Sequence, residues 1–435
     1  QTTLMDYCTG PSYASGGFIA DSQFDGTVIN GSQQQWLTRN SALTTWSNGV
    51  WNQVFAGVTG APAGCFPAQA GCGGPYTTIE ETTVSKEAPT LYVDGRGRYQ
   101  VFVPEVRRNT QGTSWGDGDP AGKSIPIDKF YVARPGDDLR KINNALARGQ
   151  HLLLTPGVYD IDRAIQVTRA NTVALGLGYA TLIPQRGTAA LTVADVPGVD
   201  IAGVTIDAGP KNSKVLLQVG TKHGRHACGP ENPTVLHDVF FRIGGAAAGK
   251  ATVSLEVNSD HTILDNIWAW RADHGNGVGW TVNTADTGVV VNGDNVTAHG
   301  LFVEHYQKTQ TIWNGQNGRV VFFQNELPYD PPSQEAWTQP SGALGYPALK
   351  VSDKVRRFSG TAMGSYSFFN QGVDIYADNA FEVPTRLPAG SLTNLLTVFL
   401  DPTNGKGGIL NVVNGVGGSS TIANPSVPVT VVGYP

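Results

Sequence analysis

Short apolar runs separated by Gly and Asn dominate the second half of the chain. They lie at residues 152–155, 165–167, 172–175, 199–206, 235–241, 263–270, 296–303 and 320–323. Runs of this length, rich in β-branched and aromatic residues, are typical of strands. Most successive runs start roughly 22–35 residues apart, which is the repeat of a solenoid coil with turns of variable length. The pattern predicts an all-β solenoid.

An amphipathic segment lies just before these runs. Its apolar positions at helical spacing are Leu139, Ile142 and Leu146. Asp137 or Asp138 can cap the first turn, and Gly149 can end the helix. A helix here would plug the open end of the first coil, where a free end would expose unpaired strand edges. The segment therefore predicts the start of a right-handed parallel β-helix of the pectate-lyase-like kind.

The same pattern suggests three parts. Residues 128–435 are predicted to form the β-helix with its helical plug. Residues 1–108 also have the pattern of strands and loops, with candidate rungs at 16–22 and 27–30, yet no plug precedes them. We expect them to be the terminal part of an earlier β-helix, joined by a Gly-rich linker at 109–127. A β-sandwich is the alternative, but it would need neither a plug nor this repeat.

The charge balance narrows the range of partners. Only 15% of the residues are charged, the net charge is -5 and the isoelectric point is about 5.9. These values give no reason to expect nucleic acid or an anionic membrane as a partner. No apolar stretch approaches the roughly 18 residues of a membrane span. A neutral or weakly charged ligand is favoured.

Several features favour an extracellular protein. The chain begins with Gln1 rather than Met, so we expect that a signal peptide has been removed. The cysteines are Cys8, Cys65, Cys72 and Cys228, which allow three disulfide pairings or free thiols. The close pair Cys65 and Cys72 is the easiest bridge to draw. Glycosylation sequons at Asn30 and Asn295 point the same way, so we predict a secreted glycoprotein.

Two carboxylates lie inside apolar and aromatic runs. Glu304 follows Phe302 and Val303, and Glu326 follows a Phe-Phe pair. A carboxylate in such a setting is costly unless it is paired or used. Asp273 follows the preceding run, and adjacent strands are about 4.8 Å apart, so the three acids could line one groove. That spacing suits a glycosidase, with an inverting one favoured slightly over a retaining one.

An apolar setting also predicts which acid holds a proton. Because burial penalises the charged form, the better general acid is Glu326, which Leu327 and a proline follow. Glu304 and Asp273 would then polarise water and stabilise positive charge at the sugar ring. The alternative is that each is an ordinary acid at a strand end, bonded to Asn or to Lys308.

Aromatic and polar residues cluster around these acids. Five of the nine Trp lie between residues 268 and 337. Aromatic rings stack on the apolar faces of sugars, and polar side chains bind hydroxyls. The expected substrate-binding residues are Trp270, His274, His305, Tyr306, Trp313, Gln324 and Tyr329. Packing between coils is the alternative for each aromatic ring. The spacing of His, Cys and acids predicts no metal site, and no phosphate-binding loop or cofactor is expected.

Four motifs together resemble a known family. They are Phe-Ile-Ala-Asp-Ser at 18–22, Trp-Ala-Trp-Arg-Ala-Asp-His-Gly at 268–275, Phe-Val-Glu-His-Tyr-Gln at 302–307 and Phe-Phe-Gln-Asn-Glu-Leu-Pro-Tyr at 322–329. The chain is similar along nearly its whole length to glycoside hydrolase family 55, the fungal and actinobacterial exo-β-1,3-glucanases or laminarinases. The resemblance implies two tandem β-helices and inverting hydrolysis of β-1,3-glucan from the non-reducing end.

The resemblance also implies roles for single residues. Glu326 matches the general acid, Glu304 and Asp273 match further acids of the pocket, and Ser22 matches a residue of a polar network that holds the water. Members of the family usually have a complete first β-helix, whereas this chain has the pattern of its end only. We therefore expect that an N-terminal fragment of the same precursor could be a partner.

Two other functions fit a parallel β-helix. A polysaccharide lyase usually needs a calcium-binding acidic cluster and a basic residue at the reaction centre, and residues 260–330 offer few bases. A non-catalytic glycan-binding β-helix is the alternative from a different class. Both remain open on the sequence, with glucan exo-1,3-β-glucosidase activity favoured.

Overall fold

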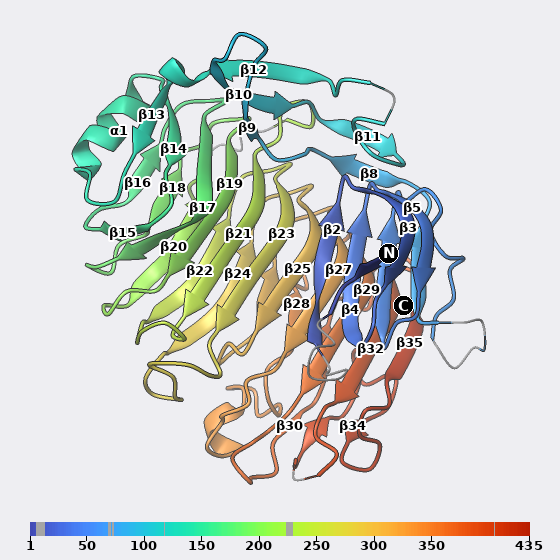
Figure 1. Ribbon diagram of the computed structural model, residues 1–435. Coiled ribbons are helices and arrows are strands. Elements are labelled where there is room, and N and C mark those ends of the chain that lie inside the picture. The colour runs from blue at the N-terminus through green and yellow to red at the C-terminus, as the bar shows by residue number, and fades with distance from the viewer. Residues whose placement is uncertain (6–13, 68–70, 72–73, 117, 223–228, 404) are drawn as a thin grey trace.

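The computed structural model describes residues 1–5, 14–67, 71, 74–116, 118–222, 229–403 and 405–435. Over these residues the main body is a parallel β-helix with two long sheets (Figure 1). The first sheet contains β13 (Phe130–Ala133), β14 (His151–Leu154), β15 (Val158–Ile161), β17 (Val173–Pro184), β19 (Asp200–Asp207), β21 (Val235–Ile243), β23 (Ile263–Arg271), β25 (Thr297–Glu304), β27 (Gly318–Glu326), β29 (Phe358–Ser367), β32 (Leu392–Phe399) and β35 (Val429–Tyr434). Its strands pair in parallel except β35, which is antiparallel to β32.

The second sheet runs alongside the first. It contains β16 (Ile165–Val167), β18 (Leu191–Val193), β20 (Ser213–Val219), β22 (Ala251–Val257), β24 (Ala285–Val291), β26 (Thr311–Trp313), β28 (Leu349–Val351) and β31 (Phe381–Glu382). From β17 to β28 each coil contributes one strand to each sheet, and the apolar side chains between the sheets form one continuous core. A small third sheet of β30 (Tyr376–Ala377), β33 (Gly408–Ile409) and β34 (Ser420–Thr421) lies near the C-terminal end. The predicted β-helix is confirmed, and every predicted run from 152 to 323 lies in or overlaps a strand.

The helical plug is also present. Helix α1 (Leu139–Ala147) begins after Asp138, whose side chain accepts a hydrogen bond from the backbone N–H of Arg140. Its buried face is formed by Leu139, Ile142, Ala145 and Leu146. Figure 1 shows α1 at the end of the β-helix beside β13, β14 and β16. The helix covers the first coil, as the apolar spacing predicts.

Asparagine side chains form ladders along the turns. Asn292 donates to Asn258 at 2.7 Å, and Asn314 donates to Asn292 at 2.8 Å. A second ladder links Asn295 to Asn317, whose side chain donates to it at 3.1 Å. Such ladders satisfy polar groups at the coil corners and repeat once per rung.

The N-terminal region forms a second stack of parallel strands. One sheet contains β2 (Ala14–Ala20), β4 (Gln33–Arg39), β6 (Asn52–Ala56) and β7 (Tyr76–Ile79), and the other β1 (Thr2–Thr3), β3 (Gln23–Ile29) and β5 (Ala42–Ser47). We call these strands the N-terminal coils. Figure 1 shows them, in blue, lying against the outer face of the first sheet over β25 to β32. Apolar contacts join the two bodies through Leu37, Val54, Ala56, Val321, Phe322 and Ala362.

The segment at 109–127 is more than the predicted linker. Strand β12 (Gly122–Pro126) lies inside it and pairs antiparallel with β10 (Tyr99–Pro104), which also pairs with β9 (Thr90–Val93). Strand β11 (Arg107–Thr110) pairs with β8 (Thr82–Ser85), and a 3-10 turn (Ile127–Lys129) follows β12. Ile125 packs with Val101 and Leu153, so burial of apolar side chains stabilises structure where glycine content predicted a linker. Strands β9, β10 and β12 form an antiparallel ribbon, which crosses the top of the molecule in Figure 1.

Buried ion pairs fasten the N-terminal region to the β-helix. The guanidinium of Arg39 donates to Asp265 at 2.9 and 3.0 Å and to Glu87 at 2.7 and 2.8 Å. Lys86 donates to both oxygens of Asp200 at 2.7 Å. A buried charge without its partner is costly. Arrangements that separate these partners are therefore disfavoured, and the ion pairs fix how the N-terminal region lies on the β-helix.

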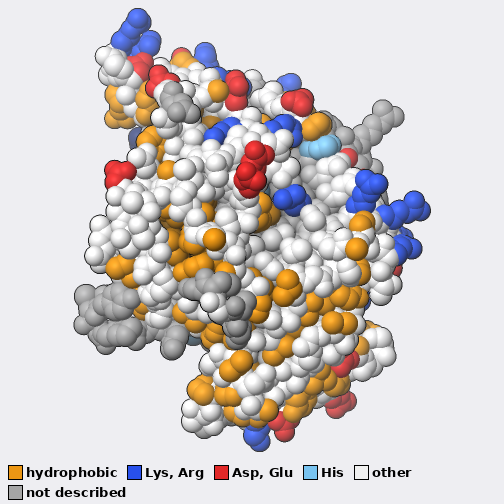
Figure 2. Space-filling model, turned by 90° about the vertical axis from the view of Figure 1, so that its right-hand side faces the viewer, with side chains coloured by type: hydrophobic (Ala, Val, Ile, Leu, Met, Phe, Trp, Pro, Cys, Tyr) orange, Lys and Arg blue, Asp and Glu red, His pale blue; other side chains and the backbone are white. Residues whose placement is uncertain are grey.

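Several remaining predictions concern the surface and the cysteines. Cys65 takes part in a disulfide bond, whereas Cys8, Cys72 and Cys228 lie outside the described residues. Asn30 is fully buried and its amide donates to the carbonyl of Gln33, so the sequon at Asn30 is not accessible in the folded chain. Figure 2 shows the side of the molecule that carries the N-terminal coils, where charged side chains are sparse and mostly gather towards the top. No helix of the described chain is long and apolar enough to cross a membrane.

Candidate active site

Two of the predicted acids, Glu304 and Glu326, lie in register on the outer face of the first sheet. Trp270 on β23 pairs with Glu304 on β25, which pairs with Glu326 on β27 and then with Tyr366 on β29. Side chains alternate along a strand, so residues in register point to the same side. The inward side at these rungs is taken by core residues such as Val303. The fold therefore brings Glu304 and Glu326 together on neighbouring rungs.

A groove forms where this face meets the N-terminal coils. The pocket there has a volume of about 270 Å³ and is lined by Ser15, Gly16, Asn266, Trp268, Phe302 and Glu304. Ser15 and Gly16 belong to β2, and the others belong to β23 and β25. The two bodies thus enclose the groove jointly, with an acid and aromatic rings on its wall.

Glu304 is the most deeply buried of the three acids. The indole Nε1 of Trp268 donates to its Oε2 at 2.8 Å. Burial raises the pKa of Glu304 to about 8, and the negative charge of Glu326 adds to this rise, while the donors of Trp268 and Gln324 oppose it. A carboxyl with this pKa is protonated near neutral pH.

Glu326 has a more polar setting than its sequence suggests. The hydroxyl of Tyr329 donates to its Oε2, and the amide of Gln324 lies 3.4 Å from its Oε1. The Nε2 of His305 is 3.7 Å from Oε2, and the side chain is 12% exposed. The phenylalanines at 322 and 323 do not surround this carboxyl as the sequence pattern predicts, because they pack in apolar clusters elsewhere.

Asp273 lies at the end of the same groove wall, just after β23. Its Oδ1 accepts a hydrogen bond from Nε1 of Trp270 at 3.2 Å and lies 2.9 Å from Nδ1 of His274. The Nε2 of His305 is 3.6 Å away. Burial raises the pKa of Asp273, but His305 and His274 outweigh it and lower the pKa below the ordinary value. Asp273 is therefore the ionised acid of the site.

His305 connects two of the acids. Its Nδ1 is hydrogen-bonded to the backbone carbonyl of Leu327 at 3.1 Å, which orients the ring so that Nε2 faces Asp273 and Glu326. Since Oδ1 of Asp273 lies 3.6 Å and Oε2 of Glu326 lies 3.7 Å from this one nitrogen, the two carboxylates are close neighbours around the imidazole. The arrangement brings two carboxyls to one imidazole, so that both can act on a bond held beside them.

The predicted binding residues divide into two groups. Trp270, His274, His305, Gln324 and Tyr329 surround the acids through the contacts given above. Tyr306 and Trp313 are fully buried among the core residues between the sheets, so the prediction that they contact a ligand was wrong. Trp313 packs on Phe358 at 5.3 Å, and the hydroxyl of Tyr306 bonds to Ser254.

Ser22 does not line the groove. Its hydroxyl donates to the carbonyl of Ala20, and its backbone N–H donates to Ser41. From the N-terminal coils it is Ser15 and Gly16 that reach the pocket. Gly16 has a φ of +145°, and a Cβ there would lie 2.1 Å from the carbonyl oxygen of Gln35, so only glycine fits.

Trp268 is a site residue that the sequence pattern left unassigned. It stands two positions before Trp270, and the rings stack with centroids 5.2 Å apart and an angle of 16°. The period of two along a strand would have placed both rings on one face. Phe302 could be found the same way, because it lies two positions before Glu304.

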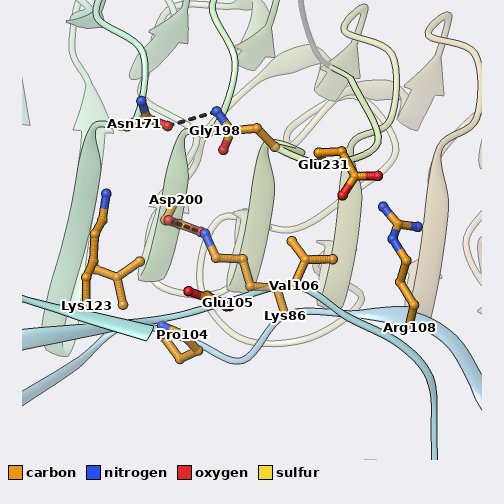
Figure 3. A pocket seen from close by; sticks show the side chains of 12 residues that line it. Lys86, Pro104, Glu105, Val106, Arg108, Lys123, Asn171, Gly198, Asp200 and Glu231 are labelled. Carbon is orange, nitrogen blue, oxygen red and sulfur yellow. Dashed lines mark hydrogen bonds and ion pairs between the residues drawn. The ribbon is translucent and has the colours of Figure 1, made fainter. Parts of the chain in front are cut away.

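A larger cavity lies elsewhere, between the β9–β10–β12 ribbon and the β-helix. It has a volume of about 550 Å³, and its lining residues include Lys86, Glu105, Arg108, Lys123, Asp200 and Glu231. Figure 3 shows Lys86 and Asp200 bonded to one another at its centre. Its buried carboxylate is thus neutralised and none of its lining side chains is aromatic, so the groove beside Glu304 is the better candidate.

A parallel β-helix with a coupled pair of carboxyls in an aromatic groove defines a class of polysaccharide-degrading enzyme. Comparison with known proteins identifies the family. Residues 130–326 match the LAM55 pectate lyase-like domain. An exo-β-1,3-glucanase of Streptomyces sp. strain SirexAA-E is 52% identical over 428 residues, which are 98% of this chain and 68% of that protein. The chain belongs to the Lam55 family of exo-β-1,3-glucanases, glycoside hydrolase family 55.

Solved structures agree with this assignment. The structure of sacteLam55A from Streptomyces sp. SirexAA-E matches with a TM-score of 0.93 and 50% identity, covering 100% of this chain and 76% of that one. A glutamate-to-alanine variant of the same protein in complex with glucose matches with a TM-score of 0.91 and 51% identity, covering 98% and 75% of the two chains.

Proposed function

We propose that this protein is a glucan exo-1,3-β-glucosidase, which hydrolyses β-1,3-glucan such as laminarin and releases glucose. The observation that carries the proposal is the pair Glu304 and Glu326, in register on adjacent rungs of the groove wall, with the pKa of Glu304 raised to about 8. The family supplies the substrate class. One similar protein is an exo-β-1,3-glucanase, and a variant of sacteLam55A forms a complex with glucose.

In this proposal Glu326 is the general acid that protonates the leaving oxygen. Glu304 and Glu326 interact strongly, so the proton belongs to the pair rather than to one residue. Glu326 is the less deeply buried of the two, and the hydroxyl of Tyr329 and the amide of Gln324 hold its carboxyl. Delivery of this proton from Glu326 to the leaving oxygen leaves both carboxyls of the pair ionised, and the proton released by the attacking water restores the starting state.

The reaction inverts the anomeric centre. An inverting mechanism needs one carboxyl to protonate the leaving oxygen and a second to act on the attacking water, and Glu326 and Asp273 lie beside the same imidazole nitrogen of His305. Asp273 is ionised and can polarise that water or stabilise the positive charge that develops at the sugar ring. The indole Nε1 of Trp270 donates to Asp273 and helps to hold this carboxylate in place.

We also propose that the protein is secreted. The disulfide bond of Cys65 supports this, because disulfides persist in oxidising compartments.

An N-terminal fragment of the same precursor remains a further proposed partner. Native mass spectrometry of the purified protein would reveal such a fragment as added mass, and a lone 435-residue species would contradict it.

The proposal is tested by incubation with laminarin while proton NMR follows the first products. Inversion requires that α-glucose appears before mutarotation mixes the anomers. Absence of glucose would overturn the proposed activity, and β-glucose as the first product would overturn the inverting mechanism. Products that absorb in the ultraviolet would instead indicate a lyase, and unaltered substrate that stays bound would indicate a glycan-binding protein.

A further inference from the structure

Two stacked indole rings each hold one of the acids. Trp268 and Trp270 project from the same face of β23, and their rings are nearly parallel. The Nε1 of Trp268 donates to Glu304 at 2.8 Å, and the Nε1 of Trp270 donates to Asp273 at 3.2 Å. The orientation of each carboxyl is thus tied to the orientation of one ring.

The neighbouring residues hold these rings in place. Phe240 on the next strand contacts Trp268 edge-on, with centroids 6.4 Å apart and an angle of 71°. On the far side of the stack, a Cβ at Gly245 would lie 2.9 Å from the ring of Trp270, so the backbone packs directly on that indole. These contacts restrict the rotation of the two rings, so each N–H keeps one direction.

The charged groups around Glu304 show why this one donor matters. Glu326 faces it from β27, Asp273 from the loop after β23, and the hydroxyls of Tyr306 and Tyr329 lie close enough to feel its charge. Strand β2 contributes only Ser15 and Gly16. Among the described residues the side chains that donate to Glu304 are therefore Trp268 and the amide of Gln324, which also contacts Glu326.

We propose that Trp268 is a positioning residue of the reaction, whose indole N–H fixes the Glu304 carboxyl and controls its ionisation without the ring having to bind substrate. The expected effect of Trp268 on kcat rests on the proposed hydrolase function. A donor to a carboxyl favours the ionised form, so Trp268 keeps Glu304 easier to ionise than burial alone would. Its removal should make Glu304 retain its proton to higher pH.

Trp268→Phe tests the inference because it keeps an aromatic ring and removes the N–H. We expect kcat on laminarin to fall about tenfold while KM stays within about twofold, since orientation rather than binding is lost. The alkaline limb of the pH profile of kcat should move upward by about one pH unit, as removal of a charge-assisted hydrogen bond implies. A purely structural role would lower activity without moving that limb.

Two variants control for packing. Trp115→Phe makes the same substitution at a ring that is 44% exposed and donates to the backbone of Asp21, so its profile should match the unaltered protein. Phe240→Leu loosens the edge contact on Trp268 but leaves the N–H in place, so the alkaline limb should move much less than in Trp268→Phe. A shift in Phe240→Leu as large as in Trp268→Phe would overturn the inference.

A second readout does not depend on activity. Infrared difference spectra against Glu304→Gln isolate the carboxyl band of Glu304, whose loss with rising pH reports its ionisation directly. We expect that loss at higher pH in Trp268→Phe. An unchanged titration would overturn the role of Trp268 even if laminarin is hydrolysed, whereas failure of the unaltered protein to release glucose would overturn only the proposed function.

Discussion

At the scale of single residues, burial and hydrogen bonding separate the three acids of the groove. Glu304 is buried beside another carboxylate, so its pKa rises to about 8. Asp273 is also partly buried, yet the imidazoles of His274 and His305 keep it ionised. Glu304 and Asp273 thus acquire different protonation states because their neighbours differ.

The role of Glu326 can be separated from that of Glu304 by the leaving group. A general acid is needed most when the leaving group is a poor one, such as a sugar hydroxyl. We expect Glu326→Gln to lower kcat on laminarin by about 10³-fold or more and to retain most activity on a dinitrophenyl β-glucoside, which leaves without protonation. Glu304→Gln should not be rescued by that substrate. Equal losses of Glu326→Gln on both substrates would show that it is not the acid.

The raised pKa of Glu304 predicts a pH dependence. Its carboxyl is protonated below about pH 8 and loses its proton above it. A pair that has lost this proton cannot protonate the leaving oxygen, so kcat should fall as pH rises through about 8. The fall is measured from initial rates on laminarin between pH 5 and pH 10, a range that covers both sides of the expected change. In Glu304→Gln, which cannot ionise, that limb should be absent from the residual activity.

At the scale of the strand, a repeated bend decides which side chains reach the groove. Successive strands of the first sheet each contain one residue with positive φ at the same place, including Asp238, Asn266, Gly300, Phe322 and Ala362. The pairing register skips these residues. A left-handed residue shifts the alternation by one position, so side chains three apart can face the same way. Because of the bend, side chains of one strand can reach both the groove and the buried ion pairs that join the N-terminal region to the β-helix.

Gly300 tests the bend. Its φ is +69°, and a Cβ there would lie 3.0 Å from the ring of Phe18 on the N-terminal coils. We expect Gly300→Ala to lower the free energy of unfolding by about 1–3 kcal/mol, because backbone strain adds to a tight contact. Gly390→Ala is the control, since its φ of +72° carries the same strain and nothing lies within 4 Å. If denaturant unfolding shows equal losses for both, the contact with Phe18 contributes nothing.

At the scale of the whole molecule, the groove depends on how two stacks of coils are joined. One wall comes from β2 and the other from β23 and β25. Arg39 joins them through Asp265, which is 226 residues away along the chain. His237 and His299 lie on the rungs beside Asp265, each with a ring nitrogen 3.7 Å from its carboxylate. The cluster is fully enclosed, so it sets orientation as well as stability.

Arg39→Met tests this junction. Loss of the guanidinium leaves Asp265 and Glu87 without their shared partner, and breaking a buried pair typically costs about 3–5 kcal/mol. We expect a loss of that size in denaturant unfolding. Arg98→Met removes a guanidinium that is 61% exposed and should change stability by less than about 1 kcal/mol. A loss in Arg39→Met as small as in this control would show that the junction does not hold the coils.

The same ion pair predicts an acid sensitivity. Although burial raises the pKa of Asp265, Arg39 and the neighbouring histidines outweigh it and hold the pKa far below the ordinary value. A depressed pKa adds stability above the unfolded value, near 3.9, and that stability is lost as pH falls below it. The melting temperature should therefore drop steeply below about pH 4. In Asp265→Asn, which cannot ionise, the drop should be shallower.

Much of this architecture follows from the sequence alone. The strand runs, the plug capped by Asp138 and the turn ladders are local, because a β-helix coil is built from residues near each other in the chain. The positions of Glu304 and Glu326 after equivalent runs also follow from the repeat, which puts equivalent residues on neighbouring rungs. The family motifs lie in these same strands.

Only the tertiary structure decided the features that depend on contacts outside the repeat. It buried Tyr306 and Trp313 in the core, because the face of a side chain depends on where each strand bends, and it turned a glycine-rich stretch into the sheet strand β12. It also reversed the expected environments of the two glutamates, since Trp268 and Tyr329 reach them through space. The sequence alone determines that two acids stand on adjacent rungs of a β-helix, but the protonation of each depends on burial and on contacts between residues that only folding brings together.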